Sequence, residues 1–109
     1  MASYKKIKKI EGGANLTTIN AGAFYGCKKL TSLKLAATGI KTIGKQAFYN
    51  CSKLKTVEIN GSSLKSVKKD AFKGINSKAK INIKASKKKY SKLVKLFKKA
   101  GANVTFKRK

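Results

Sequence analysis

Apolar positions along the chain recur with a step of 24 residues. The dipeptide Ala47-Phe48 is preceded by Ala23-Phe24 and followed by Ala71-Phe72. The same step links five further sets of positions: Leu16, Ile40 and Leu64; Ile19, Ile43 and Val67; Gly26, Asn50 and Gly74; Leu33, Val57 and Ile81; Leu35, Ile59 and Ile83. Seven positions that keep one period over three units indicate an array of stacked repeats.

Each unit is predicted to hold two short apolar alternations joined by a turn, the second of them a strand. It opens with an apolar alternation such as Ile40-Lys41-Thr42-Ile43, and a single helical or 3₁₀ turn then carries the Ala-Phe pair. That turn is expected to end on a residue type that accepts a left-handed backbone, at Gly26, Asn50 or Gly74. Two apolar residues around a polar one, the signature of a half-buried strand, follow at Leu33-Lys34-Leu35, Val57-Glu58-Ile59 and Ile81-Asn82-Ile83.

A unit of 24 residues cannot bury its apolar face alone, so the units must stack. Stacking places Leu33, Val57 and Ile81 side by side in a parallel sheet, with the phenylalanines in a ladder behind them. We therefore divide the chain into a partial N-terminal repeat at 1–15, three repeats at 16–85 and a C-terminal cap at 86–109. In the entry segment Ile7 and Ile10 are expected to supply a partial strand, and Gly12-Gly13 a turn.

The cap is predicted to contain a helix over 87–100 and a strand over 103–107. Ser86 is the expected N-cap of the helix, and Gly101 is the residue at which it stops. Val104-Thr105-Phe106 repeats the strand signature 23 residues after Ile81. The apolar face of the helix is expected to cover the exposed end of the stack; it consists of Tyr90, Leu93, Val94 and Phe97.

The repeated segments 23–30 and 43–51 have the consensus Ile-x-x-x-Ala-Phe-x-Gly/Asn-Cys-x-x-Leu. This pattern resembles the BspA-like leucine-rich repeat family over about Leu16 to Ile83. The resemblance implies an α/β solenoid, a right-handed superhelix of short parallel strands and one-turn helices closed by a capping helix and strand. Members are typically modules of bacterial or protist surface and secreted proteins, associated with adhesion and with binding of proteins or glycans. An extracellular or cell-surface location is therefore implied, as part of a longer exported chain.

The charge of the chain is strongly one-sided. It has 28 basic residues, all lysine except Arg108, against three acidic residues, Glu11, Glu58 and Asp70, and a net charge of +25. Such a surface concentrates polyanions near the protein. An anionic glycan or an acidic protein is the expected partner, although a bias in composition would also raise the lysine content.

The residues offer little for catalysis. The chain has no histidine, and its three carboxylates are isolated, so neither acid–base pairs nor metal sites are expected. Cys27 and Cys51, one period apart, are expected to pack as small buried apolar groups, although a disulfide between them is an alternative. No apolar run is long enough to span a bilayer. We predict no enzyme activity, no cofactor and no metal.

Candidate binding residues therefore lie on surfaces. Residues between the buried strand positions are expected to face solvent on the concave side of the solenoid, where such arrays bind; they are Ser32, Lys34, Thr56, Glu58, Lys80, Asn82 and Thr105. A second candidate is a lysine stripe on the helix that could hold a polyanion; it consists of Lys88, Lys92, Lys95 and Lys99. Tyr25 and Tyr49 form either an exposed aromatic pair for a sugar or a base, or a cover for the edge of the core.

The favoured function is a non-catalytic binding or adhesion module, monomeric, whose basic surface attracts anionic glycans or acidic proteins. One alternative is a structural cap or spacer of a larger repeat protein associated with its own cell wall. Another is a non-specific nucleic-acid or polyanion binder. Sequence-specific DNA reading is not expected, because arginine, the residue that pairs with guanine, is nearly missing.

Overall fold

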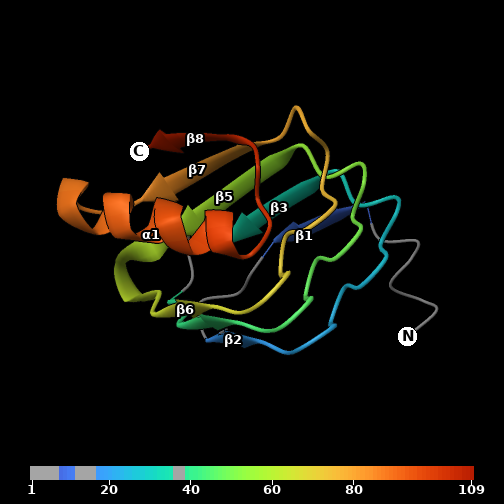
Figure 1. The fold of residues 1–109 in the computed structure, drawn as a ribbon, viewed down its shortest axis with the longest axis horizontal. Coiled ribbons are helices and arrows are strands. Elements are labelled where there is room, and N and C mark those ends of the chain that lie inside the picture. Colours follow the sequence, from blue (N-terminus) through green and yellow to red (C-terminus); the bar gives the residue numbers. More distant parts are fainter. Residues whose placement is uncertain (1–7, 12–16, 36–38) are drawn as a thin grey trace.

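The chain folds as a stack of coils with two parallel sheets (Figure 1). The computed structural model describes residues 8–11, 17–35 and 39–109, and the side chain of Glu11 is not among the parts described. The large sheet has the order β1 (Lys9–Glu11), β3 (Ser32–Leu35), β5 (Thr56–Asn60), β7 (Lys80–Lys84) and β8 (Thr105–Arg108). The small sheet has the order β2 (Thr18–Ile19), β4 (Thr42–Ile43) and β6 (Ser66–Val67). The expectations at Ile7, Gly12-Gly13 and Leu16 lie outside the described residues.

The register of the large sheet confirms the predicted stacking. Leu33 pairs with Val57, and Val57 pairs with Ile81, so one residue of each coil occupies the same row. Ile10 of β1 continues this row next to Leu33. The members of the row from β3, β5 and β7 are fully buried. The 24-residue period therefore corresponds to one turn of the stack.

The Ala-Phe segments are hydrogen-bonded turns, and the expected helical or 3₁₀ turn does not form. Alternate amides of the first coil, those of Ala23, Tyr25 and Cys27, donate to carbonyls three residues earlier at 3.1 Å. The amides between them donate instead to the next coil at 2.7–2.8 Å; these bonds run from Gly22 to Lys45, from Phe24 to Ala47 and from Gly26 to Tyr49. A helix would use every amide within its own segment. The bonds between coils therefore exclude it.

Two positions in each of these turns have a left-handed backbone. The predicted position is confirmed, with φ of +69° at Gly26, +58° at Asn50 and +84° at Gly74. A second position, four residues earlier, was not predicted, because only the first coil has glycine there. Its φ values are +65° at Gly22, +56° at Gln46 and +58° at Asp70.

Aromatic rings form a continuous ladder through the core. Phe48 is fully buried, and its ring centroid lies 5.4 Å from Phe24 and 5.2 Å from Phe72, with nearly parallel planes. The cap extends this ladder, because Phe97 lies 5.2 Å from Phe72 and Phe106 lies 6.1 Å from Phe97. The phenylalanines of the cap thus take the place of a fourth coil.

The helix α1 (Lys87–Lys99) covers the last coil. It contacts β6, β8 and the 3₁₀ turn η2 (Gly61–Ser63), so it lies against the last strand of both sheets. The Ser86 hydroxyl accepts a hydrogen bond from the Lys89 amide at 3.3 Å, as expected for an N-cap. After the helix, Gly101 has φ +94°, and the Ala102 amide donates to the Phe97 carbonyl at 3.0 Å, a Schellman closure.

The last strand has a different register from the one expected. The spacing of 23 residues aligned Val104 with Ile81, but β8 pairs Phe106 with Ile81 and Arg108 with Ile83. The shift of two residues follows from the helix end, because the chain must first turn through Gly101 before it rejoins the sheet. Thr105 keeps its outward side, whereas Arg108 takes the place of an apolar residue in the row Leu35, Ile59 and Ile83.

Replacing Phe48 by alanine should destabilise the stack by about 3–5 kcal/mol, because the ring is fully buried between two neighbours. Denaturant unfolding followed by circular dichroism measures the loss. Tyr25→Ala is the control: its side chain is 50% exposed, so the loss should stay below about 1.5 kcal/mol. Equal losses would contradict the assignment of the phenylalanine ladder as the main support of the core.

Replacing Gln46 by glycine should raise the free energy of unfolding by about 0.5–1 kcal/mol, because the left-handed backbone at this position disfavours a side chain. The neighbouring variant Lys45→Gly is the control, since its φ is not positive. The control should destabilise, because glycine adds only freedom to the unfolded chain. A loss of stability in both variants would argue against strain at Gln46.

Candidate binding surface

Polar side chains form two rows across the outer side of the large sheet. They alternate with the buried strand residues, and the parallel register aligns them from coil to coil. The first row consists of Lys9, Ser32, Thr56, Lys80 and Thr105. The second row begins at Glu11, of which only the backbone is described, and its described side chains are those of Lys34, Glu58, Asn82 and Lys107. We call the nine residues with described side chains the sheet face; it contains all seven residues predicted for the concave side.

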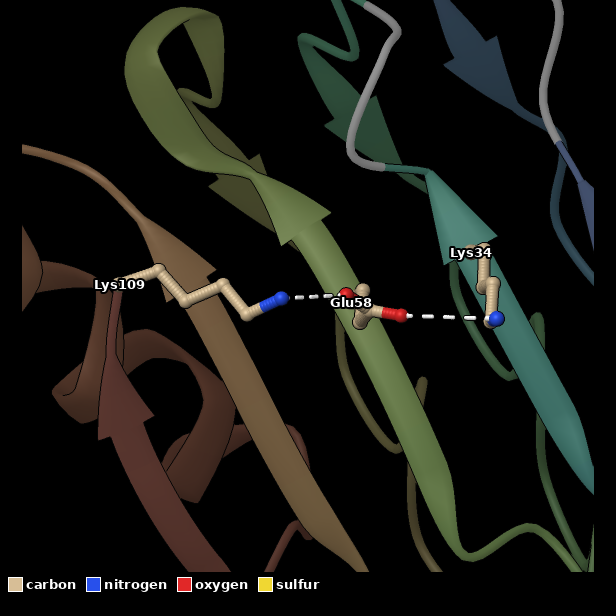
Figure 2. A network of polar contacts seen from close by, with 3 residues as sticks. All are labelled: Lys34, Glu58 and Lys109. Carbon is tan, nitrogen blue, oxygen red and sulfur yellow. Dashed lines mark hydrogen bonds and ion pairs between the residues drawn. The ribbon is translucent and has the colours of Figure 1, made fainter.

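Glu58 is held between two lysines at the centre of the sheet face. Its Oε1 lies 2.6 Å from the Lys109 ammonium, and its Oε2 lies 3.9 Å from that of Lys34. Figure 2 shows that Lys109 reaches across β7 to make this contact, whereas Lys34 lies on the adjacent strand. The Glu58 side chain is only 19% exposed, against about half for each lysine. Its negative charge is therefore matched within the protein.

The lysines also change the acidity of this carboxyl group. The hydrogen bond from Lys109 holds the pKa of Glu58 below its ordinary value of 4.5, and the positive charges of Lys109 and Lys34 act in the same direction. Desolvation raises the pKa, but by less than the hydrogen bond lowers it. Because the folded pKa is depressed, the pair stabilises the fold above about pH 4.5 and loses that contribution as the pH falls through the folded pKa.

The helix stripe lies on a different element. All four of its lysines are exposed on α1; they are Lys88, Lys92, Lys95 and Lys99. The opposite side of the helix is used in the core, where Leu93 and Phe97 are buried. Since Tyr90 and Val94 are partly buried against the same cluster, the apolar side of α1 is covered by the stack.

The two tyrosines form a stacked pair beside the turns. The rings of Tyr25 and Tyr49 lie 5.0 Å apart at an angle of 13°. Tyr25 is 50% exposed and Tyr49 is partly buried. The pair thus presents an aromatic surface at Tyr25, while Tyr49 has the more covered position.

The cysteines have a packing role. Both are fully buried thiols. The Cys51 Sγ donates to the Phe24 carbonyl at 3.2 Å, and burial raises the pKa of Cys51 to about 12. A thiol held in this protonated form is a poor nucleophile. Within residues 8–11, 17–35 and 39–109, no group of three or more metal-ligating side chains lies together.

A shallow groove of about 580 Å³ runs over the small sheet. Thr18, Ile19 and Thr42 lie along its floor, and Lys45, Lys68 and Lys69 also line it. The accessible lining of the groove is mainly apolar, and it lies on the side of the stack that belongs to β2, β4 and β6.

Sequence reasoning missed several basic residues near the sheet face. Lys9 could have been found from its pairing position beside Ser32, since Ile10 was already assigned to a partial strand. Lys84 lies one residue beyond the predicted strand and pairs with Asn60. Lys107 and Lys109 could not be placed, because their positions depend on the shifted register of β8.

Parallel coils of 24 residues, each contributing one strand to a large sheet and one to a small sheet, define a leucine-rich repeat solenoid. The family model described as "BspA type Leucine rich repeat region (6 copies)" matches residues 2–100, so the chain belongs to the BspA-type leucine-rich repeat family. No curated protein and no solved structure shows significant similarity to the chain. Among the helices that the structure describes, none has the length and apolar character needed to cross a membrane.

Lys109→Gln should raise the pKa of Glu58 more than Lys34→Gln does, because Lys109 is the closer cation and donates a hydrogen bond. An NMR titration of the Glu58 carboxyl carbon measures both shifts against the unmodified protein. The two variants remove the same charge and so control for each other. Equal shifts would mean that only the general positive field of the protein acts on this carboxylate.

Proposed function

We propose that this protein is a non-catalytic binding module whose sheet face attracts an extended anionic ligand, either an anionic glycan or an acidic protein. Its family supports a repeat module of the binding type. By the same reasoning we place it at a cell surface or outside the cell, where it would serve adhesion.

The observation that carries this proposal is the charge balance of the sheet face. Its lysines come from four different strands, and they are Lys9, Lys34, Lys80 and Lys107. Glu58 is the one carboxylate among the described side chains of this face, and it is already paired with Lys34 and Lys109. The remaining positions carry hydroxyl or amide groups, which donate hydrogen bonds to anionic oxygens. Even with Glu11 at the β1 edge of the second row, the face therefore carries more cations and hydrogen-bond donors than carboxylates.

The spacing of the lysines favours an extended ligand. Lys9 and Lys80 are three strand positions apart in the first row, and so are Lys34 and Lys107 in the second. At the usual distance between neighbouring strands this separation is about 14 Å. A small anion cannot contact two such lysines at once. A polymer with several negative groups can contact two or more of these lysines at once, and each contact adds to its affinity.

Replacing Lys34 and Lys80 together by glutamine should weaken binding to a heparin-like glycan about tenfold at near-physiological salt. Two exposed ion pairs are worth up to about 2 kcal/mol together, and 1.4 kcal/mol corresponds to tenfold. The matched control is the double variant Lys88→Gln and Lys92→Gln on the helix stripe, which removes the same charge. Titration calorimetry over a salt series, with teichoic acid and duplex DNA as further ligands, measures the affinities.

The outcomes separate the alternatives. A larger loss in the sheet-face variant supports the proposal. Equal losses in both variants, with equally steep salt dependence for all three ligands, would mean binding by net charge alone, as in a non-specific polyanion binder. The absence of binding to any of them would favour a structural cap or spacer, and a larger loss in the helix variant would move the site to α1.

A further inference from the structure

The structure assigns a second ligand site: a basic pocket for a compact tetrahedral oxyanion, a phosphate or sulfate group, beside Arg108. The pocket has a volume of about 460 Å³ and lies where β5, β7 and β8 end and α1 begins. We call it the Arg108 pocket; it is lined by Asn60, Ser62, Lys84, Ala85, Ser86, Arg108 and Lys109. Its described lining contains three cationic side chains and no acidic side chain.

Arg108 stands out by its position. It is the one arginine of the chain, and it occupies a row in which Leu35, Ile59 and Ile83 are buried apolar residues. Its Nε donates to the Ala85 carbonyl at 3.0 Å, which fixes the guanidinium at the edge of the pocket. In the described structure it forms no ion pair. The four N–H groups of its terminal nitrogens therefore stay available, in the fork geometry that matches two oxygens of one anion.

Several acceptors around the pocket are already used in hydrogen bonds within the protein. The Asn60 Oδ1 accepts from both the amide and the hydroxyl of Ser62, at 3.1 and 2.7 Å. The Ser62 carbonyl accepts from the Lys89 ammonium, and the Ser86 hydroxyl oxygen accepts from the Lys89 amide at 3.3 Å. The donors are left over: the Asn60 amide nitrogen, the Ser86 hydroxyl hydrogen and the Lys84 ammonium. A pocket lined by hydrogen-bond donors favours a ligand whose polar atoms are hydrogen-bond acceptors.

The surrounding charges also favour an anion. The nearest acid along β5 is Glu58, whose charge is matched by Lys109 and Lys34. The first turn of α1 has no acidic residue and begins with Lys87, Lys88 and Lys89, the reverse of the charge that a helix start favours. A bound oxyanion would relieve this repulsion. The pocket is confined to the ends of β5, β7 and β8, whereas the lysines of the sheet face are spread over four strands, so the two surfaces suit different chemistry.

The test is titration of the intact protein with inorganic sulfate, inorganic phosphate and acetate, at constant ionic strength set by chloride. Backbone amide NMR shifts follow the binding. We expect saturable shifts at Asn60, Lys84 and Ser86 with sulfate and phosphate, and weaker ones with acetate, which has only two oxygens. Arg108→Gln should weaken sulfate and phosphate binding at least about tenfold, the loss expected from one charge-assisted hydrogen bond.

The matched control is Lys107→Gln, which removes one charge from the neighbouring residue on the other side of β8. It should weaken binding by less than about threefold, as expected for one exposed charge. Arg108→Lys keeps the charge but loses the fork, and should fall between the two. Lys84→Gln is the second test within the pocket and should also weaken binding more than Lys107→Gln.

Equal weakening by Arg108→Gln and Lys107→Gln, or shifts that do not saturate, would overturn the Arg108 pocket. The result is independent of the proposed function, because none of the four sheet-face lysines lines the Arg108 pocket. Loss of glycan binding in the Lys34 and Lys80 double variant leaves the pocket untouched, and the sulfate titration of that variant should remain unchanged.

Discussion

The fold depends on one constraint: about half of the amides in the turn of each coil must donate hydrogen bonds to the next coil. This ladder fixes the repeat length, because the donors at Phe24 and Phe48 meet carbonyls of Ala47 and Ala71 only when successive coils match. It also fixes where coils approach closely. A Cβ on Gly44 would lie 2.5 Å from the Ala21 amide nitrogen of the preceding coil. At the end of the stack the helix completes the ladder, since the Phe72 amide donates to the Ala100 carbonyl at 3.0 Å.

Buried positions could be predicted from the sequence because burial repeats with the coil. Leu33, Val57 and Ile81 need only be apolar and 24 residues apart, and both features are visible in the chain. The turn geometry could not be predicted in the same way. Each amide of the turn can donate either to a carbonyl of its own turn or to a carbonyl of the next coil. Which of the two it uses depends on how the coils pack against each other, and the sequence of one turn does not show this. The second left-handed position was hidden for a related reason: Gly22, Gln46 and Asp70 share a backbone conformation without sharing a residue type.

The residues of the candidate site likewise fall into two groups, those that could be predicted from the sequence and those that could not. Outward residues within the three repeats, such as Lys34, Thr56 and Asn82, follow from strand alternation once the buried rows are known. The outward residues of the cap could not be predicted in this way. The helix replaces the loop and turns of a coil, so the 24-residue spacing does not hold between β7 and β8. The step from Ile83 to Arg108 is 25 residues, one more than the repeat. That extra residue brings an arginine into an apolar row and Lys109 within reach of Glu58.

The arrangement of charge, more than its total, decides which ligands the basic surfaces suit. A net charge of +25 is compatible with folding because the described lysines lie outside the buried core. On the sheet face, the lysines within one row are about 14 Å apart, more than the Debye length of about 8 Å at physiological salt, so within a row they act almost independently. Affinity there grows with the number of contacts that one ligand spans. In the Arg108 pocket, Lys84 and Arg108 line the same volume of about 460 Å³, together with Lys109, whose ammonium is paired with Glu58. The same excess of positive charge thus favours an extended partner on one surface and a compact anion on the other.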